Sequence, residues 1–355
     1  MSTYERVAEL PLEVESWSME GLAIRPAPDF ERLTTVIRVE GGGLTGLGED
    51  ITYEALDQIA LQDAGPTHDL TGVKTVGEFC DLIGSLDLFP GPPEREVSRL
   101  YRRWAFESAA LDLALWQAGT SLAAFLGRPL NPLTFVASMG LAGGPGGTES
   151  DVGRLRAKLD RYPELKFKLD PSLDWGQELI DELVATGAVN TLDLKGQYKG
   201  TVVDIETDPE LYRRLLTSFP DAWIEDPDLT PETREALKDD WRRVTWDAPI
   251  HSVDDIAALE HKPTVINIKP SRMGGLKSTF DAYDYCEAEG IGAYGGGQWE
   301  LGVGRDQIQY LAALFHPDTP NDTAPVGYNA AEPEPGLPTS PMEVPGNGFG
   351  KPDGS

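Results

Sequence analysis

A change of pattern near residue 133 constrains the fold of this chain more than any other feature. Beyond it, short apolar segments recur at a regular pace, and amphipathic stretches with helical spacing lie between most of them. The apolar segments read "LTFVASMG", "LKFKLD", "NTLDLKG", "AWIEDPD", "RVTWDAP", "TVINIKPS" and "GIGAYGGG". Strands that alternate with helices form βαβ units and a parallel sheet. At least seven units in succession, without a glycine-rich nucleotide loop after the first, favour a closed (β/α)7β barrel at residues 131–320.

The first 130 residues are expected to form a separate α+β capping domain. "ERLTTVIRVE" alternates apolar and polar residues as a half-buried strand does, and "GGGLTGLGE" reads as a turn into another strand. Residues 92–119 begin with proline, keep apolar residues at helical spacing and end on glycine, which predicts a long helix. Residues 19–30 are expected to form a loop that closes the barrel mouth. Residues 321–355, rich in proline and glycine, are expected to form an extended C-terminal tail.

The charge of the chain excludes two classes of partner. Asp and Glu number 59 against 30 Lys and Arg, which gives a net charge of −29. Such a surface repels phosphate backbones and anionic lipid head groups, so we expect no nucleic-acid partner and no membrane partner. Cys80 and Cys286 are too few for a disulfide framework, and we expect a cytoplasmic location. A homo-oligomer is compatible with the sequence, which carries no signal for or against one.

Charged residues stand near the ends of several predicted strands that should otherwise be buried. They are Lys166, Lys168, Asp193, Lys195, Glu225, Asp226, Asp247 and Lys269. Burying an unpaired charge is costly, so these side chains must meet one another, a metal or water. The carboxyl ends of barrel strands converge on one mouth, where active sites are found. Because side chains at i and i+2 share a face of a strand, Lys166 is expected beside Lys168, and Asp193 beside Lys195.

Three of these acids, on three successive strands, suit a hard divalent cation. Asp193, Glu225 and Asp247 offer the oxygen ligands that Mg²⁺ or Mn²⁺ prefers, and three converging anions would repel one another without a cation. Lys166 and Lys168 precede the acids in the chain, and Lys269 follows them. A lysine near a metal and other lysines can act as a base near neutral pH. A metal can also stabilise the enediolate that forms when the proton next to a carboxylate leaves.

This ordered set resembles the muconate-lactonizing branch of the enolase superfamily, within the mandelate racemase/muconate lactonizing family. The branch includes muconate cycloisomerases, o-succinylbenzoate synthases, N-acylamino acid racemases and dipeptide epimerases. The resemblance covers nearly the whole chain and includes "KFK" at 166–168, "IEDP" around Glu225, and "IKPSRMGG" around Lys269. Glu225 and Asp247 are 22 residues apart, as are Asp247 and Lys269. "GLTGLGE" and "AFESAALDLALWQ" resemble the family's capping domain, and "GGGQWELGVGR" resembles its seventh-strand loop.

The resemblance implies a TIM-like barrel whose active site acts on a small carboxylate. Lysines at 166, 168 and 269 would act as bases, and the acids at 193, 225 and 247 would bind Mg²⁺ or Mn²⁺. The enzyme would be an isomerase or lyase that removes the proton alpha to the substrate carboxylate. Asp226, Arg272 and Glu300 are further candidates for contacts to the substrate or to these groups.

Two positions depart from the pattern of that branch. The third strand usually carries D-x-N, and here it carries Asp193, Leu194 and Lys195. Ala248 and Pro249 follow Asp247 where an acid and a serine are usual. We expect Lys195 to pair with a carboxylate at the barrel mouth and to weaken metal binding, because its charge repels a cation. These departures keep open an alternative, a carboxylate-binding barrel that is not catalytic or holds no metal.

Overall fold

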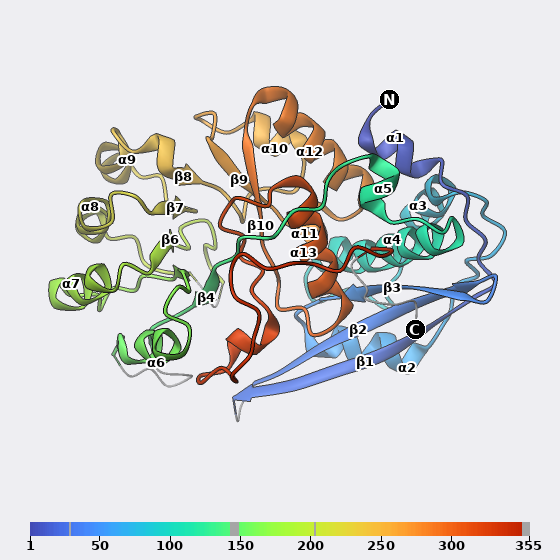
Figure 1. Ribbon diagram of the computed structural model, residues 1–355, viewed down its shortest axis with the longest axis horizontal. Coiled ribbons are helices and arrows are strands. Elements are labelled where there is room, and N and C mark those ends of the chain that lie inside the picture. The colour runs from blue at the N-terminus through green and yellow to red at the C-terminus, as the bar shows by residue number, and fades with distance from the viewer. Residues whose placement is uncertain (28–29, 143–148, 202–203, 350–355) are drawn as a thin grey trace.

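The computed structural model describes residues 1–27, 30–142, 149–201 and 204–349. Two units lie side by side (Figure 1). An antiparallel sheet and its helices form the N-terminal unit, and parallel strands with their helices form the second. One cluster of buried apolar side chains has members in both units, such as Phe79 and Ile268, so the units share a continuous core.

The N-terminal unit is built on a three-stranded antiparallel sheet. Its strands, in spatial order, are β1 (Ser16–Ala27), β2 (Phe30–Gly41) and β3 (Leu44–Asp50). Its helices are α1 (Thr3–Ala8), α2 (Ala55–Ala64), α3 (Val76–Ser85), α4 (Ser98–Gln117) and α5 (Leu122–Leu126). Helix α4 lies within the long helix predicted at 92–119, and glycines let it approach β3 closely. A Cβ atom at Gly46 would lie 2.2 Å from the backbone oxygen of Ala109, and one at Gly48 would lie 2.0 Å from that of Ala105.

The loop predicted at residues 19–30 is largely strand, so that prediction is wrong. β1 pairs with β2 from Ser16 opposite Glu40 to Ala27 opposite Phe30. The hydrogen-bonded ladder outweighs the weak strand preference of Gly21 and Pro26. Residues 28 and 29, between the two strands, lie outside the described residues.

The second unit alternates parallel strands with helices, as predicted. The strands are β4 (Ala137–Met139), β5 (Phe167–Leu169), β6 (Val189–Asp193), β7 (Trp223–Glu225), β8 (Val244–Thr245), β9 (Val265–Ile268) and β10 (Gly292–Gly295). The helices are α6 (Gly153–Arg161), α7 (Gln177–Thr186), α8 (Pro209–Ser218), α9 (Pro231–Leu237), α10 (Val253–Ala257), α11 (Pro270–Met273), α12 (Leu276–Glu289) and α13 (Val303–Phe315), with 3-10 turns η1 (Trp241–Arg243) and η2 (Val326–Asn329). β4 to β8 form one parallel sheet in chain order, and β9 and β10 form another.

Further backbone contacts link the edges of the two parallel sheets. The backbone N–H of Asn267 in β9 donates to the oxygen of Trp246, which follows β8, at 3.0 Å. Asn321 pairs in parallel with Phe135, which precedes β4, and Asp322 pairs in parallel with Gly296, which follows β10. Residues 321–322 therefore lie between the strand that leads into β4 and the strand that ends at β10.

Glu49, near the end of β3, connects the two units. Its carboxylate accepts the backbone N–H groups of Leu301 at 2.7 Å, Gly302 at 2.9 Å and Gly304 at 2.8 Å. These groups surround the start of α13, so the acid caps the N-terminus of that helix. Burial raises the pKa of Glu49, and the N–H groups that it accepts act in the opposite direction. This contact fixes the N-terminal unit against the loop that follows β10.

The C-terminal segment has little regular structure but is bound to the rest of the molecule. Met342 and Leu133 exchange two backbone hydrogen bonds, at 2.7 and 2.9 Å. Phe349 is fully buried and meets the rings of Trp104 and Tyr310 edge-on. Residues 350–355 lie outside the described part of the chain.

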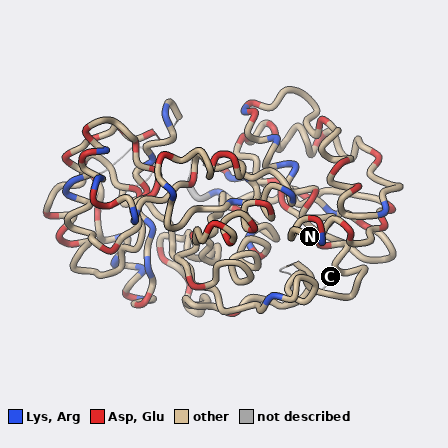
Figure 2. Tube along the Cα trace, turned by 90° about the horizontal axis from the view of Figure 1, so that it is seen from above, with Lys and Arg blue, Asp and Glu red and all other residues tan. Residues whose placement is uncertain are grey.

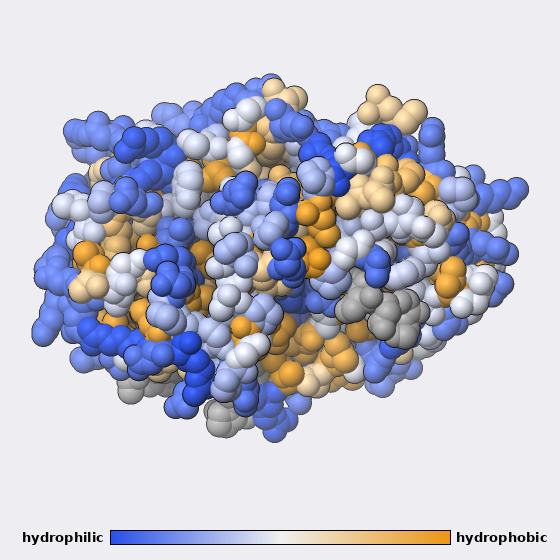
Figure 3. Space-filling model, viewed as in Figure 1, coloured by the Kyte–Doolittle hydropathy of each residue, from blue (hydrophilic) through white to orange (hydrophobic). Residues whose placement is uncertain are grey.

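The surface agrees with the acidic composition. Acidic residues are spread over both units, with basic residues among them (Figure 2). On the face seen in Figure 3, hydrophilic residues cover the outer edge of the α/β unit, and apolar residues gather toward the middle. Among the described helices, none is both long and apolar enough to cross a membrane.

Candidate active site

Lys168 is the basic residue of β5 that enters the site. Its side chain is buried, and its ammonium nitrogen lies 2.5 Å from Oε1 of Glu225 and 3.0 Å from Oδ2 of Asp193. Asp322, in the segment beyond α13, lies 3.6 Å away. Burial alone would lower the pKa of Lys168, but these carboxylates raise it well above its ordinary value. Three elements that are far apart in the sequence therefore converge on one ammonium.

Lys166 does not share this face, contrary to the prediction. Lys166 precedes β5, which begins at Phe167, so the strand pairing that orients Lys168 does not include it. Lys166 is exposed, and its ammonium donates to the backbone oxygen of Gly187 at 2.9 Å. β5 therefore brings one lysine, not two, to the site.

Lys195 follows β6 and bonds to the carboxylate of Asp193, so the expected ion pair is present. Its ammonium also lies 3.4 Å from Asp170, which follows β5. Lys195 has a φ of 53°, in the left-handed region that residues with a Cβ rarely adopt. Burial would raise the pKa of Asp193, but the charges of Lys168 and Lys195 lower it to about 2. Asp193 is thus ionised and already shared by two ammonium groups.

Asp247 follows β8 and is held by two other cations. Its Oδ2 lies 2.8 Å from the ammonium of Lys269, and its Oδ1 lies 2.6 Å from the guanidinium of Arg272. The hydroxyl of Tyr198 donates to Oδ2 at 3.1 Å. Burial opposes ionisation of Asp247, but Arg272 and Lys269 hold its pKa well below the usual range. Lys269 directly precedes α11, so this short helix places both cations beside one carboxylate.

Glu225 and Asp226 end β7 as adjacent buried acids. Asp226 has a φ of 49° and accepts the backbone N–H groups of Asp247 at 2.8 Å and Ala248 at 2.9 Å. Oε2 of Glu225 is buried and has no hydrogen-bond partner among the described residues. Burial and the nearby negative charges raise the pKa of Glu225 to about 8, although Lys168 opposes this, and raise that of Asp226 to about 7. The positive charge near these two acids is therefore too small to offset their burial and the neighbouring negative charges.

These groups form one acid–lysine cluster. It contains Asp170, Asp193, Glu225, Asp226, Asp247 and Asp322 with Lys168, Lys195, Lys269 and Arg272. Six acids face four cations, so the fully ionised cluster has an excess of two negative charges. Asp193, Glu225 and Asp226 each offer an oxygen, and these oxygens lie within 4.8 Å of one another. The excess charge and the unpartnered oxygen of Glu225 fit a divalent cation.

The predicted ligand Asp247 does not belong to that group of three acids. Both of its oxygens are held by the cations on and before α11. Asp226, predicted as a supporting residue, takes the third place in the group, although its oxygens accept two backbone N–H groups. A ligand role for Asp247 would require Lys269 and Arg272 to release it.

Glu300 supports the loop after β10. Its carboxylate is buried, accepts the backbone N–H of Gln298 at 2.7 Å and lies 3.0 Å from the guanidinium of Arg305. Arg32 of β2 donates to the backbone oxygens of Gln298 at 3.1 Å and Trp299 at 3.3 Å. Arg32 of the N-terminal unit thus binds this loop, and Glu300, which is part of the loop, stabilises it through its own hydrogen bond.

The sequence pattern did not indicate three members of the site. Asp170 and Tyr198 follow strands β5 and β6, so their place at strand ends was an available signal. Tyr198 lies between two cations: its ring is 5.3 Å from the ammonium of Lys195, and Arg272 lies 3.4 Å from its hydroxyl. Asp322 lies in a segment without periodicity, which gave no signal.

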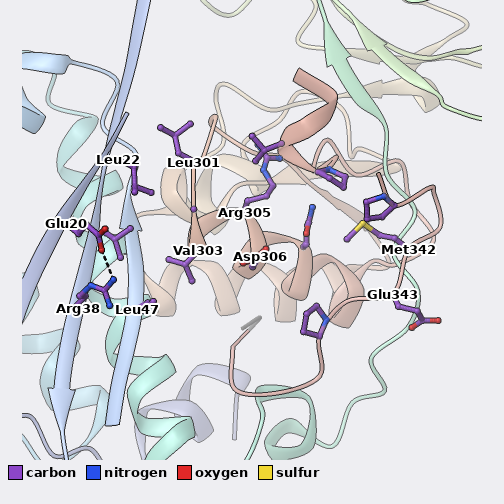
Figure 4. A pocket seen from close by; sticks show the side chains of 17 residues that line it. Glu20, Leu22, Arg38, Leu47, Leu301, Val303, Arg305, Asp306, Met342 and Glu343 are labelled. Carbon is purple, nitrogen blue, oxygen red and sulfur yellow. Dashed lines mark hydrogen bonds and ion pairs between the residues drawn. The ribbon is translucent and has the colours of Figure 1, made fainter. Parts of the chain in front are cut away.

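A cleft of about 630 Å³ lies outside this cluster, between the N-terminal sheet and α13 (Figure 4). Leu22, Leu47, Leu301 and Val303 form its apolar wall, and Glu20 and Arg38 pair at 2.6 Å on the sheet side. None of the clustered acids lines it. The cleft is therefore a separate feature from the candidate active site.

The fold of this chain is shared by solved structures of one class of protein. A structure from Listeria innocua, described as a member of the enolase superfamily, is 19% identical, covers 89% of this chain and 86% of its own, and has a TM-score of 0.64. A dipeptide epimerase from Methylococcus capsulatus, complexed with a Mg ion, is 20% identical, covers 87% of this chain and 89% of its own, and has a TM-score of 0.65. These likenesses show a common fold, a capping domain with a TIM-like barrel in the neighbours.

Curated relatives agree with the fold. The o-succinylbenzoate synthase of Bacillus subtilis (strain 168) is 28% identical over 221 residues, which cover 61% of this chain and 57% of that protein. The o-succinylbenzoate synthase of Geobacillus stearothermophilus is 28% identical over 321 residues, which cover 83% of this chain and 78% of that protein. In the first match the chain spans just over half of its relative's length. The predicted resemblance to the enolase superfamily is confirmed, and the relatives that carry it are enzymes.

The chain belongs to a family that family models describe as domains of unknown function. The "Domain of unknown function (DUF8230) C-terminal domain" matches residues 129–330, and the corresponding N-terminal domain matches residues 5–125. The boundary between the two matches falls between α5 and β4, where the polypeptide passes from the first unit to the second.

Proposed function

We propose that this protein is a metal-dependent isomerase or lyase that removes the proton alpha to the carboxylate of a small substrate. The observation that carries the proposal is the placement of two buried lysines on either side of the acids. Lys168 lies on β5 and Lys269 follows β9, and the strands between them carry Asp193, Glu225 and Asp247 at their ends. A carboxylate bound over the acids would have an ammonium or amine on each of its faces.

The same proposal includes a closed barrel. The parallel bridges at Asn321 and Asp322 support an eighth strand between β10 and β4. The hydrogen bond from Asn267 to Trp246 supports continuity between β8 and β9. In a closed ring every strand end faces one mouth, which accounts for the convergence of Lys168, Asp322 and Glu225.

Asp193, Glu225 and Asp247 would hold Mg²⁺ or Mn²⁺, with Asp226 beside them. When bound, a divalent cation supplies positive charge that stabilises the enediolate form of the substrate. The unpartnered oxygen of Glu225 and the excess of negative charge support this ligand set. Asp247 would belong to it if Lys269 and Arg272 released its carboxylate, which would leave both cations available to substrate oxygens or to the reacting proton.

The two lysines have separate tasks in this proposal. One takes the alpha proton at its ε-nitrogen, and the other holds a proton on the opposite face of the substrate. Arg272 lies 3.4 Å from the Tyr198 hydroxyl and would orient a substrate oxygen from the loop side. Arg32 and Glu300 keep the loop after β10 in place and help to exclude water from the mouth.

Exchange of the alpha proton with solvent deuterium tests the proposal independently of the final product. A panel of small carboxylates, including N-succinyl amino acids of both hands, is incubated in D₂O with Mg²⁺ and followed by NMR. The wild-type protein is expected to exchange at least one member, and chelation of the metal is expected to stop the exchange. Exchange that persists with the metal removed, or in a variant with both Lys168 and Lys269 changed to Met, contradicts the mechanism.

A carboxylate-binding barrel without catalysis is the second candidate. Lys195 favours it, because this ammonium and that of Lys168 already neutralise Asp193. This candidate predicts that a carboxylate from the same panel binds with or without Mg²⁺ and that no alpha proton exchanges.

A further inference from the structure

Asn267 is a buried amide whose side chain forms no hydrogen bond with the residues that the structure describes. It lies on β9, and 1% of its surface is exposed. Neither Oδ1 nor Nδ2 has a partner within the described residues. An unmet buried polar group costs about 1–3 kcal/mol, and an apolar side chain of the same shape would avoid that cost. A residue that is costly to the fold and lies in the candidate site calls for a functional explanation.

The immediate neighbour of this amide is Lys269. Lys269 directly follows β9 and its backbone is still extended, so its side chain points to the same side as that of Asn267, two positions earlier. Both side chains lie against Gly296, which follows β10. A Cβ atom there would lie 2.4 Å from Cε of Lys269, 2.8 Å from Nδ2 of Asn267 and 3.0 Å from its Oδ1. The absence of a side chain at 296 thus leaves the room that both side chains occupy.

Lys269 is paired with Asp247, and the proposed reaction requires it to leave that carboxylate. Its ammonium is bonded to Oδ2 of Asp247, 2.8 Å away. If Asp247 turns to a metal ion, the ammonium needs another acceptor close to its stem. Oδ1 of Asn267, which lies beside the stem of Lys269 next to Gly296, is a buried acceptor that has no partner among the described residues.

We propose that Asn267 is the positioning residue of Lys269, and that its amide receives the lysine when the lysine leaves Asp247. This inference rests on the proposed function, because it is the metal that claims Asp247. An amide suits this task better than an acid. Its oxygen accepts a hydrogen bond from the ammonium form and its NH₂ donates one to the neutral amine, so it supports a lysine in both protonation states.

The first test measures stability. Asn267→Leu replaces the amide by an apolar group of nearly the same shape. Because the amide is unpaired, this variant is expected to have the same Tm as the wild type or a higher one in the absence of metal. A Tm lower by several degrees would show that the amide already has a partner, such as a fixed water, and would overturn the proposal.

The second test measures the reactivity of Lys269 itself, which a purely structural residue would not alter in a metal-dependent way. Acetylation of Lys269 at fixed pH is followed by mass spectrometry, with exposed Lys166 as internal standard. With saturating Mg²⁺, Asn267→Leu is expected to speed acetylation about tenfold, because a lysine without an acceptor beside its stem is no longer held inside the cluster. Asn267→Asp is expected to slow it, because a carboxylate at 267 would pair with the lysine and hold it there more firmly. Without Mg²⁺, Asn267→Leu should change the rate less than twofold, since Asp247 still holds Lys269.

A third arm separates this inference from the proposed function. If calorimetry shows that the wild type does not bind Mg²⁺, the proposed function fails, and Asp247→Asn takes the place of the metal. In that variant without metal, the lysine loses its charged partner, and adding Asn267→Leu is expected to speed acetylation of Lys269. The role of Asn267 is overturned if the single variant Asp247→Asn and the double variant are acetylated at the same rate. It is also overturned if the wild type binds Mg²⁺ but Asn267→Leu changes the acetylation rate equally with and without the metal.

Discussion

The ammonium of Lys168 lies 2.5 Å from Oε1 of Glu225, while Oε2 of the same carboxylate has no hydrogen-bond partner in the part of the chain that the structure describes. One oxygen of the carboxylate is therefore bound to a cation of the protein, and the other is free to bind a metal ion. A divalent ion at this second oxygen would compete with Lys168 for the charge of Glu225. The base and the metal ligand of the proposed reaction are thus coupled through one side chain.

The role of Glu225 is tested by Glu225→Gln. The amide has nearly the same shape but no charge, so the excess of negative charge in the cluster falls and the metal loses a ligand. Affinity for Mg²⁺, measured by calorimetry, is expected to fall on the order of 10–100-fold or more. Glu235→Gln, at an exposed acid that pairs with Lys238 on the surface, serves as the matched control and should bind as the wild type does. Equal affinity in both variants would remove Glu225 from the ligand set.

The two bases are tested by three single variants. Lys168→Met and Lys269→Met are each expected to lower alpha-proton exchange about 10²–10⁴-fold, because each removes a group that holds or takes a proton. Lys166→Met should retain the wild-type rate, because Lys166 is exposed and bonds to the backbone of Gly187. The measurement is deuterium incorporation by NMR at saturating substrate. A loss of exchange in Lys166→Met would show that Lys166 reaches the substrate in the working enzyme, contrary to its exposed position here.

The sequence alone predicted much of this site because strand-end charges are visible in a linear pattern. Lys168, Asp193, Glu225 and Lys269 follow or end short apolar strands, so their convergence follows from parallel strands alone. Lys166 was misplaced because β5 begins only at Phe167, and the exact start of a strand is hard to predict from its residues.

Other parts of the site depend on contacts that no local pattern encodes. Residues 321–322 have no periodicity, so the bridge of Asp322 to Gly296 and its approach to Lys168 could not be predicted. Asp247 was recognised as an acid at a strand end, but its two cationic partners depend on how α11 turns beside the next strand. The strand at 16–27 was missed because its stability comes from pairing with β2 rather than from its own residues.

His316 is expected to make stability depend on pH. It is buried at the end of α13, with Nδ1 2.7 Å from Oδ1 of Asn321 and Nε2 3.2 Å from the hydroxyl of Tyr283. Burial lowers the pKa of His316 from 6.5 to about 4, although the contact with Asn321 opposes this. Between these values the unfolded chain binds more protons, so stability is complete above pH ~6.5 and is lost as pH falls toward ~4.

The size of this effect follows from the shift in pKa. It corresponds to about 3 kcal/mol, an order-of-magnitude figure for a buried group. The free energy of unfolding from urea titrations is expected to fall between pH 6.5 and 4 in the wild type. His316→Gln should be less stable at pH 7 but flatter over that interval. A variant with the same pH dependence as the wild type would assign the acid sensitivity to the carboxylates instead.

Lys195 is where this chain departs most clearly from the enolase-superfamily pattern, and Lys195→Asn restores that pattern. The left-handed φ of 53° costs a lysine about 1–2 kcal/mol, whereas asparagine adopts this region more readily. The change also removes an ammonium that bonds to Asp193 and repels a cation. Lys195→Asn is therefore expected to bind Mg²⁺ about tenfold more tightly, a gain of ~1.4 kcal/mol. Lys195→Gly separates the lost charge from the gained amide, because it relieves the backbone and removes the charge as Lys195→Asn does, but offers no amide. Calorimetry at one pH measures all three proteins. Tighter binding in both variants assigns the effect to the lost charge, and tighter binding in Lys195→Asn alone assigns it to the amide. Affinity equal to that of the wild type in both variants would show that the Lys195–Asp193 pair does not compete with the metal.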